Sequence, residues 1–142
     1  MYTFILWTFF LYCMHRLAHI IPFLKKYHND HHRQVFMGNN RSIHWSNLFL
    51  YFDTWKSTID QLLTETIPTL VICAVTGEYW LFFIYYIWAA SIQERLEHNI
   101  NFNMFPLLTS GKWHLIHHKE SNKNFGTIVP IWDIIFGTCK GL

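Results

Sequence analysis

The sequence predicts an all-α protein: an integral membrane helical bundle with a cytosolic, histidine-rich helical cap that holds a dinuclear metal site. Three observations carry this prediction. Of the 142 residues, 51% are hydrophobic and 19% aromatic. Long apolar runs occupy residues 1–21 and much of 58–98. Nine of the ten histidines stand at spacings that suit metal ligands. A chain of this length predicts a single domain, residues 1–142.

The first helix is expected over residues 1–21, because the run is apolar and ends at Pro22. A bilayer needs about 20 such residues at about 1.5 Å each. A signal peptide is disfavoured because no basic region precedes the run, no small-residue cleavage site follows it, and His15 and His19 would lie at its edge. Residues 23–36 predict a polar helix, and the turn-forming residues after them predict a loop over 37–46.

Residues 45–65 mix apolar and charged side chains, which predicts a helix that enters the membrane obliquely. Two apolar runs, 67–75 and 79–90, flank Gly77, which predicts a helical hairpin with its tip there. Extended back to 58 and forward to 98, each arm becomes long enough to cross a bilayer. All eleven Lys and Arg lie away from the tip. The positive-inside rule then places the histidines at the cytoplasmic face.

A soluble helical protein with a buried hairpin remains an alternative, because the mean hydropathy is only +0.12. The membrane interpretation is favoured because residues 79–90 offer no polar face for water. Residues 99–111 predict a connector broken by Pro106 and Gly111, followed by a helix that carries His114 and its neighbours.

Several functional classes do not fit. The formal charge of +2 and the absence of a basic, aromatic patch argue against nucleic acid. Cys13, Cys73 and Cys139 are isolated, which argues against a disulfide framework or a thiolate zinc site. The sequence also lacks H-E-x-x-H, a nucleophile triad signature, a glycine-rich phosphate loop and a haem attachment motif.

The histidine spacing predicts a metal centre. Residues three and four apart are neighbours on a helix surface, so an H-x-x-H-H box presents three imidazoles on one side of a helical turn. Two such boxes occur, and nine imidazoles exceed what one tetrahedral zinc ion can use. Two metal ions would use them all, although spacing alone does not choose iron over zinc. His44 has no partner at this spacing and is expected to be a loop or interface residue.

The ordered set of motifs resembles the fatty acid hydroxylase and sterol desaturase superfamily over nearly the whole chain. The motifs are an H-R-x-x-H box, two H-x-x-H-H boxes, an isolated histidine between them, an N-F-G segment and a W-D-x-x-F-G-T tail. In chain order they are residues 15–19, 28–32, 98, 114–118, 124–126 and 132–138.

The resemblance implies a membrane-bound di-iron oxidoreductase of lipid biosynthesis. Such an enzyme uses dioxygen and two electrons to hydroxylate or desaturate a lipid, either a fatty acyl chain or a sterol. It works with a b-type cytochrome, or a ferredoxin and its reductase, in the endoplasmic reticulum or a bacterial inner membrane. Zinc could replace iron in the purified protein. The implied ligands are His15, His19, His28, His31, His32, His98, His114, His117 and His118.

One position departs from the pattern of some members. His98 is followed at i+4 by Phe102 rather than by a second histidine. The last ligand would then be Asn101, a water molecule, or missing. The expected residues around the ligands are Asp30, Glu97 and Asp133, as acceptors from the distal N–H groups of ligating histidines, with Asn124 and Trp132 bracing the last box.

Two alternatives to the oxygenase stay open. The first is a truncated metal-binding membrane protein of the same fold that performs no turnover. The second is a soluble zinc hydrolase, which the missing general-base motif and the hydrophobic hairpin disfavour.

Overall fold

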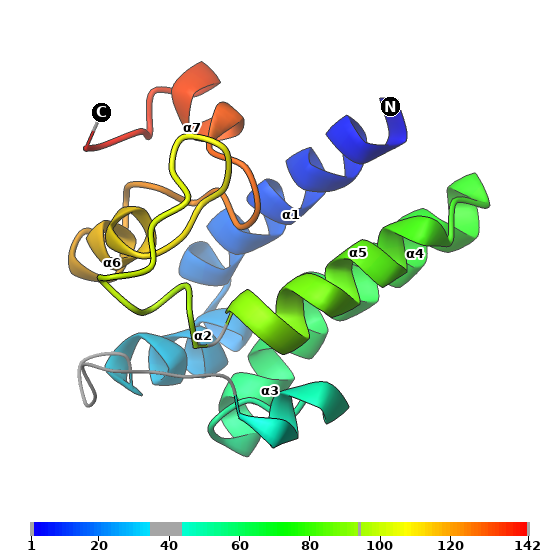
Figure 1. The fold of residues 1–142 in the computed structure, drawn as a ribbon, viewed down its shortest axis with the longest axis horizontal. Coiled ribbons are helices and arrows are strands. Elements are labelled where there is room, and N and C mark those ends of the chain that lie inside the picture. Colours follow the sequence, from blue (N-terminus) through cyan, green and yellow to red (C-terminus); the bar gives the residue numbers. More distant parts are fainter. Residues whose placement is uncertain (1, 35–43, 94, 142) are drawn as a thin grey trace.

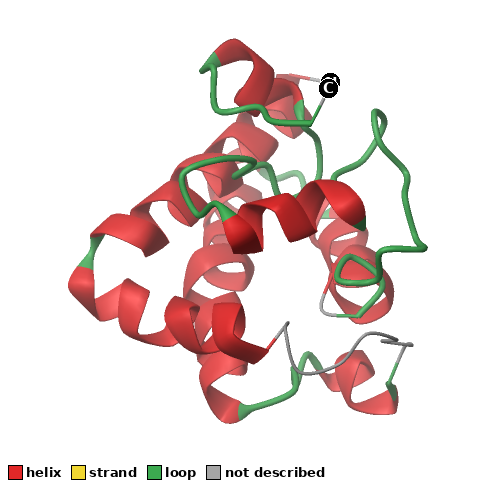
Figure 2. Cartoon of the chain, turned by 90° about the vertical axis from the view of Figure 1, so that its left-hand side faces the viewer, coloured by secondary structure: helices red, strands yellow, loops and turns green. Residues whose placement is uncertain are grey.

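The computed structural model describes residues 2–34, 44–93 and 95–141, and in this part of the chain every regular element is helical (Figure 2). Helix α1 (Tyr2–Ile20) is followed almost at once by α2 (Pro22–Gln34), and the two helices are bent by 95°. Pro22 explains the break, because proline disfavours a helical conformation at the residue before it. The predicted loop over 37–46 falls mainly on residues 37–43, outside the described residues.

The single helix predicted over 45–65 is wrong in its first half. A short 3₁₀ helix, η2 (Trp45–Phe49), ends there, and α3 (Trp55–Gln61) begins only after Thr54, whose hydroxyl accepts from the Ser57 amide. Between them, Leu50 and Asp53 have φ values of 52° and 31°. A right-handed helix excludes positive φ, so the two elements are separate.

The predicted helical hairpin is present, with Gly77 at its tip (Figure 1). Helix α3 continues through a π-helical turn, η3 (Leu62–Thr66), into α4 (Ile67–Thr76). Gly77 adopts φ 73°, which glycine tolerates without a Cβ clash, and its amide bonds to Cys73. Helix α5 (Trp80–Trp88) returns and ends in a second π turn, η4 (Ala89–Gln93). This arm is therefore shorter than predicted, because residues 95–98 form turns.

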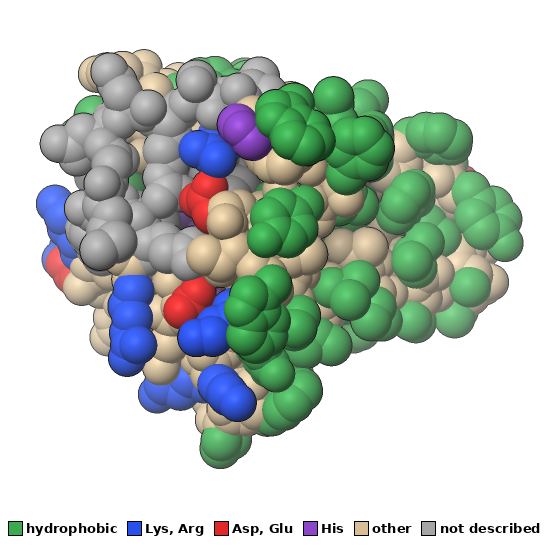
Figure 3. Space-filling model, turned by 90° about the horizontal axis from the view of Figure 1, so that it is seen from below, with side chains coloured by type: hydrophobic (Ala, Val, Ile, Leu, Met, Phe, Trp, Pro, Cys, Tyr) green, Lys and Arg blue, Asp and Glu red, His purple; other side chains and the backbone are tan. Residues whose placement is uncertain are grey.

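One helix is long and apolar enough to cross a membrane, the 22-residue stretch Trp55–Thr76. Helix α1 meets the same criteria only when joined to α2 as a bent pair, and Trp80–Gln93 is apolar but shorter. Hydrophobic side chains cover one end of the molecule while charged side chains gather at the other (Figure 3). This asymmetry is the one expected of a protein with an apolar, lipid-facing end.

Helix α1 and the hairpin pack through a buried apolar core. Trp7, Leu11 and Tyr85 are essentially inaccessible to solvent, and the indole of Trp7 donates to the Thr69 hydroxyl over 2.8 Å. This packing between α1 and the hairpin holds the end of α1 that carries His15 and His19 against the base of the hairpin.

The last third of the chain folds over the polar end. A connector leads to α6 (Lys112–Lys119), and a loop leads on to α7 (Ile131–Ile135) (Figure 1). The connector lies tightly on the start of α6, because a Cβ on Gly111 would stand 1.7 Å from the Phe102 carbonyl oxygen. Glycine at this position therefore sets the placement of the helix that carries three histidines.

Candidate metal centre

The structure brings together the nine histidines singled out from the sequence, in two adjacent groups. Within each group the ring nitrogens lie within 4.8 Å of one another. The rings of the two groups also touch each other, with 4.3 Å between the ring centroids of His32 and His118. The five-histidine group comprises His15, His19, His28, His32 and His117, and the four-histidine group comprises His31, His98, His114 and His118.

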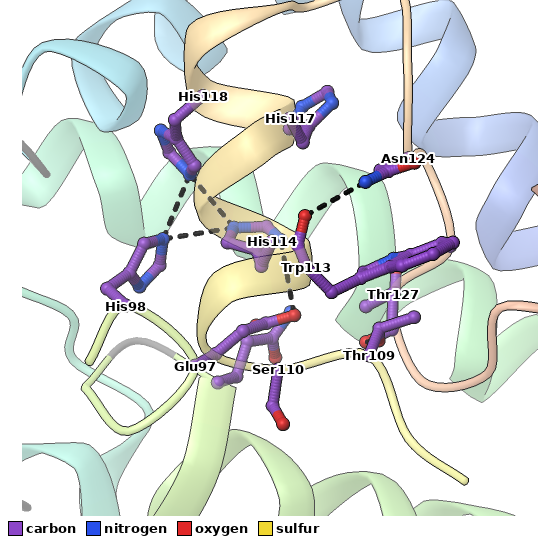
Figure 4. A network of polar contacts seen from close by, with 12 residues as sticks. Glu97, His98, Thr109, Ser110, Trp113, His114, His117, His118, Asn124 and Thr127 are labelled. Atoms are coloured by element: carbon purple, nitrogen blue, oxygen red, sulfur yellow. Dashed lines mark hydrogen bonds and ion pairs between the residues drawn. The ribbon is translucent and has the colours of Figure 1, made fainter. Parts of the chain in front are cut away.

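Each H-x-x-H-H box contributes to both groups. On an α-helix, residues i and i+4 are rotated by only about 40°, whereas i+3 is rotated by about 60° in the opposite direction. His28 and His32 therefore join one group while His31 joins the other. In α6 the assignment is reversed, because His114 and His118 join the four-histidine group and His117 points to the other side of the helix (Figure 4).

In the four-histidine group, three ring nitrogens form a closed triangle. The Nε2 atoms of His98, His114 and His118 are 2.9–3.0 Å apart along all three edges (Figure 4). A neutral imidazole nitrogen carries either one proton or one lone pair, so three such atoms cannot form three mutual hydrogen bonds. A cation that accepts all three lone pairs resolves this conflict. Neighbouring ligands at right angles on an ion about 2.1 Å away would stand about 3.0 Å apart, so the site fits a metal.

The five-histidine group shows the same convergence. Its Nε2–Nε2 distances are 3.1 Å between His19 and His117, 3.0 Å between His19 and His28, and 3.1 Å between His28 and His32. The Nε2 atom of His15 is buried and has no hydrogen-bond partner within the described chain. Buried polar atoms rarely stay without partners, which again favours a metal ion.

Acceptors at the opposite ring nitrogen turn these Nε2 lone pairs inward. The Nδ1–H of His15 donates to the Phe125 carbonyl at 2.8 Å, and that of His117 donates to the Lys123 carbonyl at 2.7 Å. His28 donates to Asp60 at 2.9 Å. Such partners fix the tautomer and ring orientation of a metal-ligating histidine.

Asp60 and the two carbonyls were missed by sequence reasoning. A carbonyl acceptor leaves no signal in the residue type, but Asp60 does leave one. It is a carboxylate within a largely apolar span, and buried charged groups are normally paired. Its 4% exposure contradicts the surface position that an oblique entry helix implied.

The residues expected around the ligands lie in different places. Glu97 has an oxygen 3.3 Å from Nδ1 of His114. Asp30 instead accepts from Thr54 and pairs with Lys56. Asp133 does not contact a histidine ring directly. Its carboxylate accepts hydrogen bonds from the amides of Phe125 and Gly126, and so holds the loop whose Phe125 carbonyl orients His15.

Four further residues complete this comparison. Asn124 is buried with φ 56° and donates to the Trp113 carbonyl, tying the last loop to α6 (Figure 4). Trp132 lies against Phe9 and donates to Thr8, so it packs on α1. Asn101 lies on an exposed turn, and His44 caps η2 through Ser46, as a loop histidine would.

The histidines of α6 are held in the neutral form that a metal ligand requires. Burial, reinforced by neighbouring imidazoles, lowers the pKa of His114, His117 and His118 well below the usual value of 6.5. Neutral imidazoles suit zinc, copper, iron and nickel. The geometry therefore shows two adjacent, nitrogen-rich groups that could each hold a metal ion, without choosing the metal.

Two cavities border the centre. On the outer side, a pocket of about 440 Å³ has Arg16, Lys25 and Lys119 in its lining and reaches both histidine groups, through His19 and His118. On the hairpin side, a small cavity of about 20 Å³ borders both groups. The outer pocket therefore opens the centre toward the polar end, whereas the small cavity lies between the centre and the base of the hairpin.

The fold and these clusters define a class: helical proteins with an apolar span and a histidine-rich centre able to hold metal ions. A model of the family described as "Fatty acid hydroxylase" matches residues 1–138. The chain belongs to that family. The resemblance inferred from the histidine boxes is therefore confirmed.

Similar proteins include lipid enzymes of two kinds. The chain is 26% identical, over 92% of its length, to a very-long-chain aldehyde decarbonylase from Oryza sativa, in both subsp. indica and subsp. japonica. It is 28% identical, over 93% of its length, to a Delta(7)-sterol 5(6)-desaturase from Aspergillus fumigatus. The chain spans 21% and 36% of the lengths of these relatives. No solved structure matches it.

Proposed function

We propose that this protein is a membrane-bound di-iron oxidoreductase that uses dioxygen to hydroxylate or desaturate a lipid. The observation that carries the proposal is the pair of adjacent histidine groups, each with ring nitrogens converging on one point. Family membership and relatives named for a long-chain aldehyde and a sterol support a lipid substrate.

The nine histidines would hold two iron ions, which supply the activation of dioxygen once two electrons arrive. The protein's own contribution is to keep the imidazoles neutral and oriented. The carbonyls of Phe125 and Lys123 and the carboxylate of Asp60 do this by accepting the distal N–H groups. Seven of the nine histidines are buried, and this limits the access of water to a reactive centre.

The four-histidine group supplies fewer ligands than its neighbour. Its nitrogens come from α2, α6 and His98, while Phe102 stands where some family members carry another histidine. A ligand set with fewer donors leaves more open positions for a small molecule. We therefore assign the binding of dioxygen to the metal ion that the four-histidine group would hold.

The lipid would approach from the apolar end and the reductant from the polar end. The exposed hydrophobic side chains of α1 and the hairpin suit contact with acyl chains, and the histidine end would face the cytoplasm. A b-type cytochrome, or a ferredoxin with its reductase, would deliver electrons near the outer pocket, whose cationic lining suits an acidic protein.

The test is oxidation of a lipid by the full chain purified in detergent and loaded with iron. A panel of fatty acyl, fatty alcohol and sterol substrates is supplied with reductant and ¹⁸O₂. We expect a hydroxylated or desaturated product that requires both iron and dioxygen. Retained metal with no product from any lipid class, under either donor system, would instead support the binding protein without turnover.

A further inference from the structure

The small cavity between the hairpin and the histidines is lined, among the described residues, by side chains that each carry a polar group. Both hairpin arms reach it through their π turns, since η3 carries Glu65 and η4 carries Gln93. Gln93 Nε2 donates to Glu65 across the two arms at 2.5 Å. π turns are rare and concentrate at functional sites. Two facing π turns that place polar side chains beside metal ligands indicate a binding role.

Hydrogen-bond acceptors are in excess around this cavity. Oε1 of Gln93, Oε1 of Gln61 and Oδ1 of Asp60 are buried and have no hydrogen-bond partner within the described chain. All three residues line the cavity and are at most 6% exposed. The orientation of the Gln93 amide is fixed, because its nitrogen is engaged by Glu65. Amide and carboxylate oxygens only accept, and the unpartnered Thr127 hydroxyl in the same lining can donate to only one of them, so the cavity calls for a ligand that donates.

The cavity's size limits what that donor can be. About 20 Å³ is room for one water-sized group, so a phosphate or a sugar does not fit, and only the terminal polar group of a lipid could enter while its chain stays outside. An O–H group fits both the volume and the acceptors.

We propose that this cavity binds a hydroxyl group of the lipid substrate, with Gln93 and Gln61 as the accepting residues. The proposal rests on the proposed function and narrows the substrate to a hydroxyl-bearing lipid. The hydroxyl fixes the lipid relative to the histidine centre, so that the carbon to be oxidised lies near it. A site built to hydrogen-bond a hydroxyl rejects analogues that lack it, because its buried acceptors are then left unpaired.

Binding of three sixteen-carbon probes to the metal-loaded protein in one detergent tests this inference without turnover. The probes are 1-hexadecanol, its methyl ether and hexadecane. Only the alcohol donates a hydrogen bond, so it should bind about fivefold more tightly than the other two. Thermal stabilisation of the protein at increasing probe concentration reports the affinity.

Two variants locate the effect. Gln93→Met and Gln61→Met keep the side-chain length but remove the acceptor, and each should reduce the preference for the alcohol while bound metal stays unchanged. Gln61→Met leaves the hydrogen bond between Glu65 and Gln93 intact, so this variant tests the proposal even if Gln93→Met folds poorly. Ser91→Ala is the matched control, since Ser91 lies in the same π turn, bonds to the Ile87 carbonyl and does not line the cavity.

Equal binding of the alcohol and the alkane would overturn the inference and leave the cavity as a site for water. Equal binding of the alcohol and its ether would overturn the donor argument. An unchanged preference in both Met variants would place the hydroxyl elsewhere. These outcomes are separate from the proposed function: an alcohol preference with no oxidation product would contradict the oxygenase alone, and oxidation without the preference would contradict the hydroxyl site alone.

Discussion

At the scale of residues, the centre depends on where each imidazole directs its lone pair. Converging Nε2 atoms repel one another unless a cation lies between them, and the acceptors at Nδ1 prevent the rings from turning away. The protein therefore holds a strained set of neutral ligands that a metal ion relieves. Residues of α6 test this account most simply, because adjacent positions belong to different groups.

The single variants His117→Ala and His118→Ala should each lose one metal ion. His117 belongs to the five-histidine group and His118 to the four-histidine group, so bound metal should fall from two ions per chain to about one in each variant. Lipid oxidation should be lost in both. Elemental analysis of the purified variants measures this, with His44→Ala as the control that keeps both ions. Unchanged metal and turnover would remove the assignment of these ligands.

The metal-free protein should lose stability as pH falls below about 6.5. The pKa values of His114, His117 and His118 are lowered in the folded state, whereas unfolded histidines keep their ordinary value near 6.5. The unfolded chain then takes up protons that the folded chain does not, which favours unfolding at lower pH. Thermal midpoints after chelation, measured from pH 7.5 to 5, should decline. A flat profile would show that these rings are not held neutral.

At the scale of elements, the sequence predicted the helices better than their junctions. The helical hairpin with Gly77 at its tip and the helix carrying His114 follow from apolar patterning and breakers, and both are present. The predicted continuous helix from Trp45 is wrong because Leu50 ends η2 in a left-handed conformation and Asp53 also has positive φ, which the residue types at these positions do not reveal.

The sequence predicts only part of how the nine histidines divide between the two groups. Helical geometry pairs i with i+4, so His28 with His32, and His114 with His118, could be predicted to share a group. Which pairs come together depends on how α1, α2 and α6 pack, and spacing carries no information about that. The two π turns could not be predicted from the sequence either, because no residue pattern marks an inserted residue in a helix.

Two glycines should differ sharply in their tolerance of alanine. At Gly77 a Cβ would meet nothing within 4 Å, so the left-handed φ alone should cost about 1 kcal/mol. At Gly111 a Cβ would meet the Phe102 carbonyl, so the connector must move and α6 with it. Gly77→Ala should retain both metal ions with a slightly lower thermal midpoint, and Gly111→Ala should lose metal. Equal metal content in the two variants would contradict this role of the connector.

At the scale of the whole molecule, hydrophobic side chains gather at one end and charged side chains at the other (Figure 3). The hairpin brings two π turns and the cavity to one side of the histidines, while α1, α2 and α6 form the outer pocket on the other. Under the proposed function, this arrangement would separate the route of a lipid from that of a reductant. The histidines of the two groups come from segments across the whole chain.

Charge reversal at the outer pocket should weaken coupling to an acidic electron donor. Lys25 lines this pocket, whereas its neighbour Lys26 does not. With reduced ferredoxin as the donor, Lys25→Glu should raise KM several-fold and reduce its dependence on salt, because an attractive charge is replaced by a repulsive one. Lys26→Glu is the matched control and should change KM less. Equal effects of both variants would indicate a general charge effect rather than docking at the pocket.

The central claim is that the two histidine groups form one dinuclear centre. The measurement that tests it most directly is the identity and number of metal ions bound to the full chain purified in detergent, determined by elemental analysis against protein concentration. We expect two ions per chain, iron in protein purified with its native metal retained. A chain that binds no transition metal, or binds a single zinc ion and stays soluble without detergent, would contradict this claim.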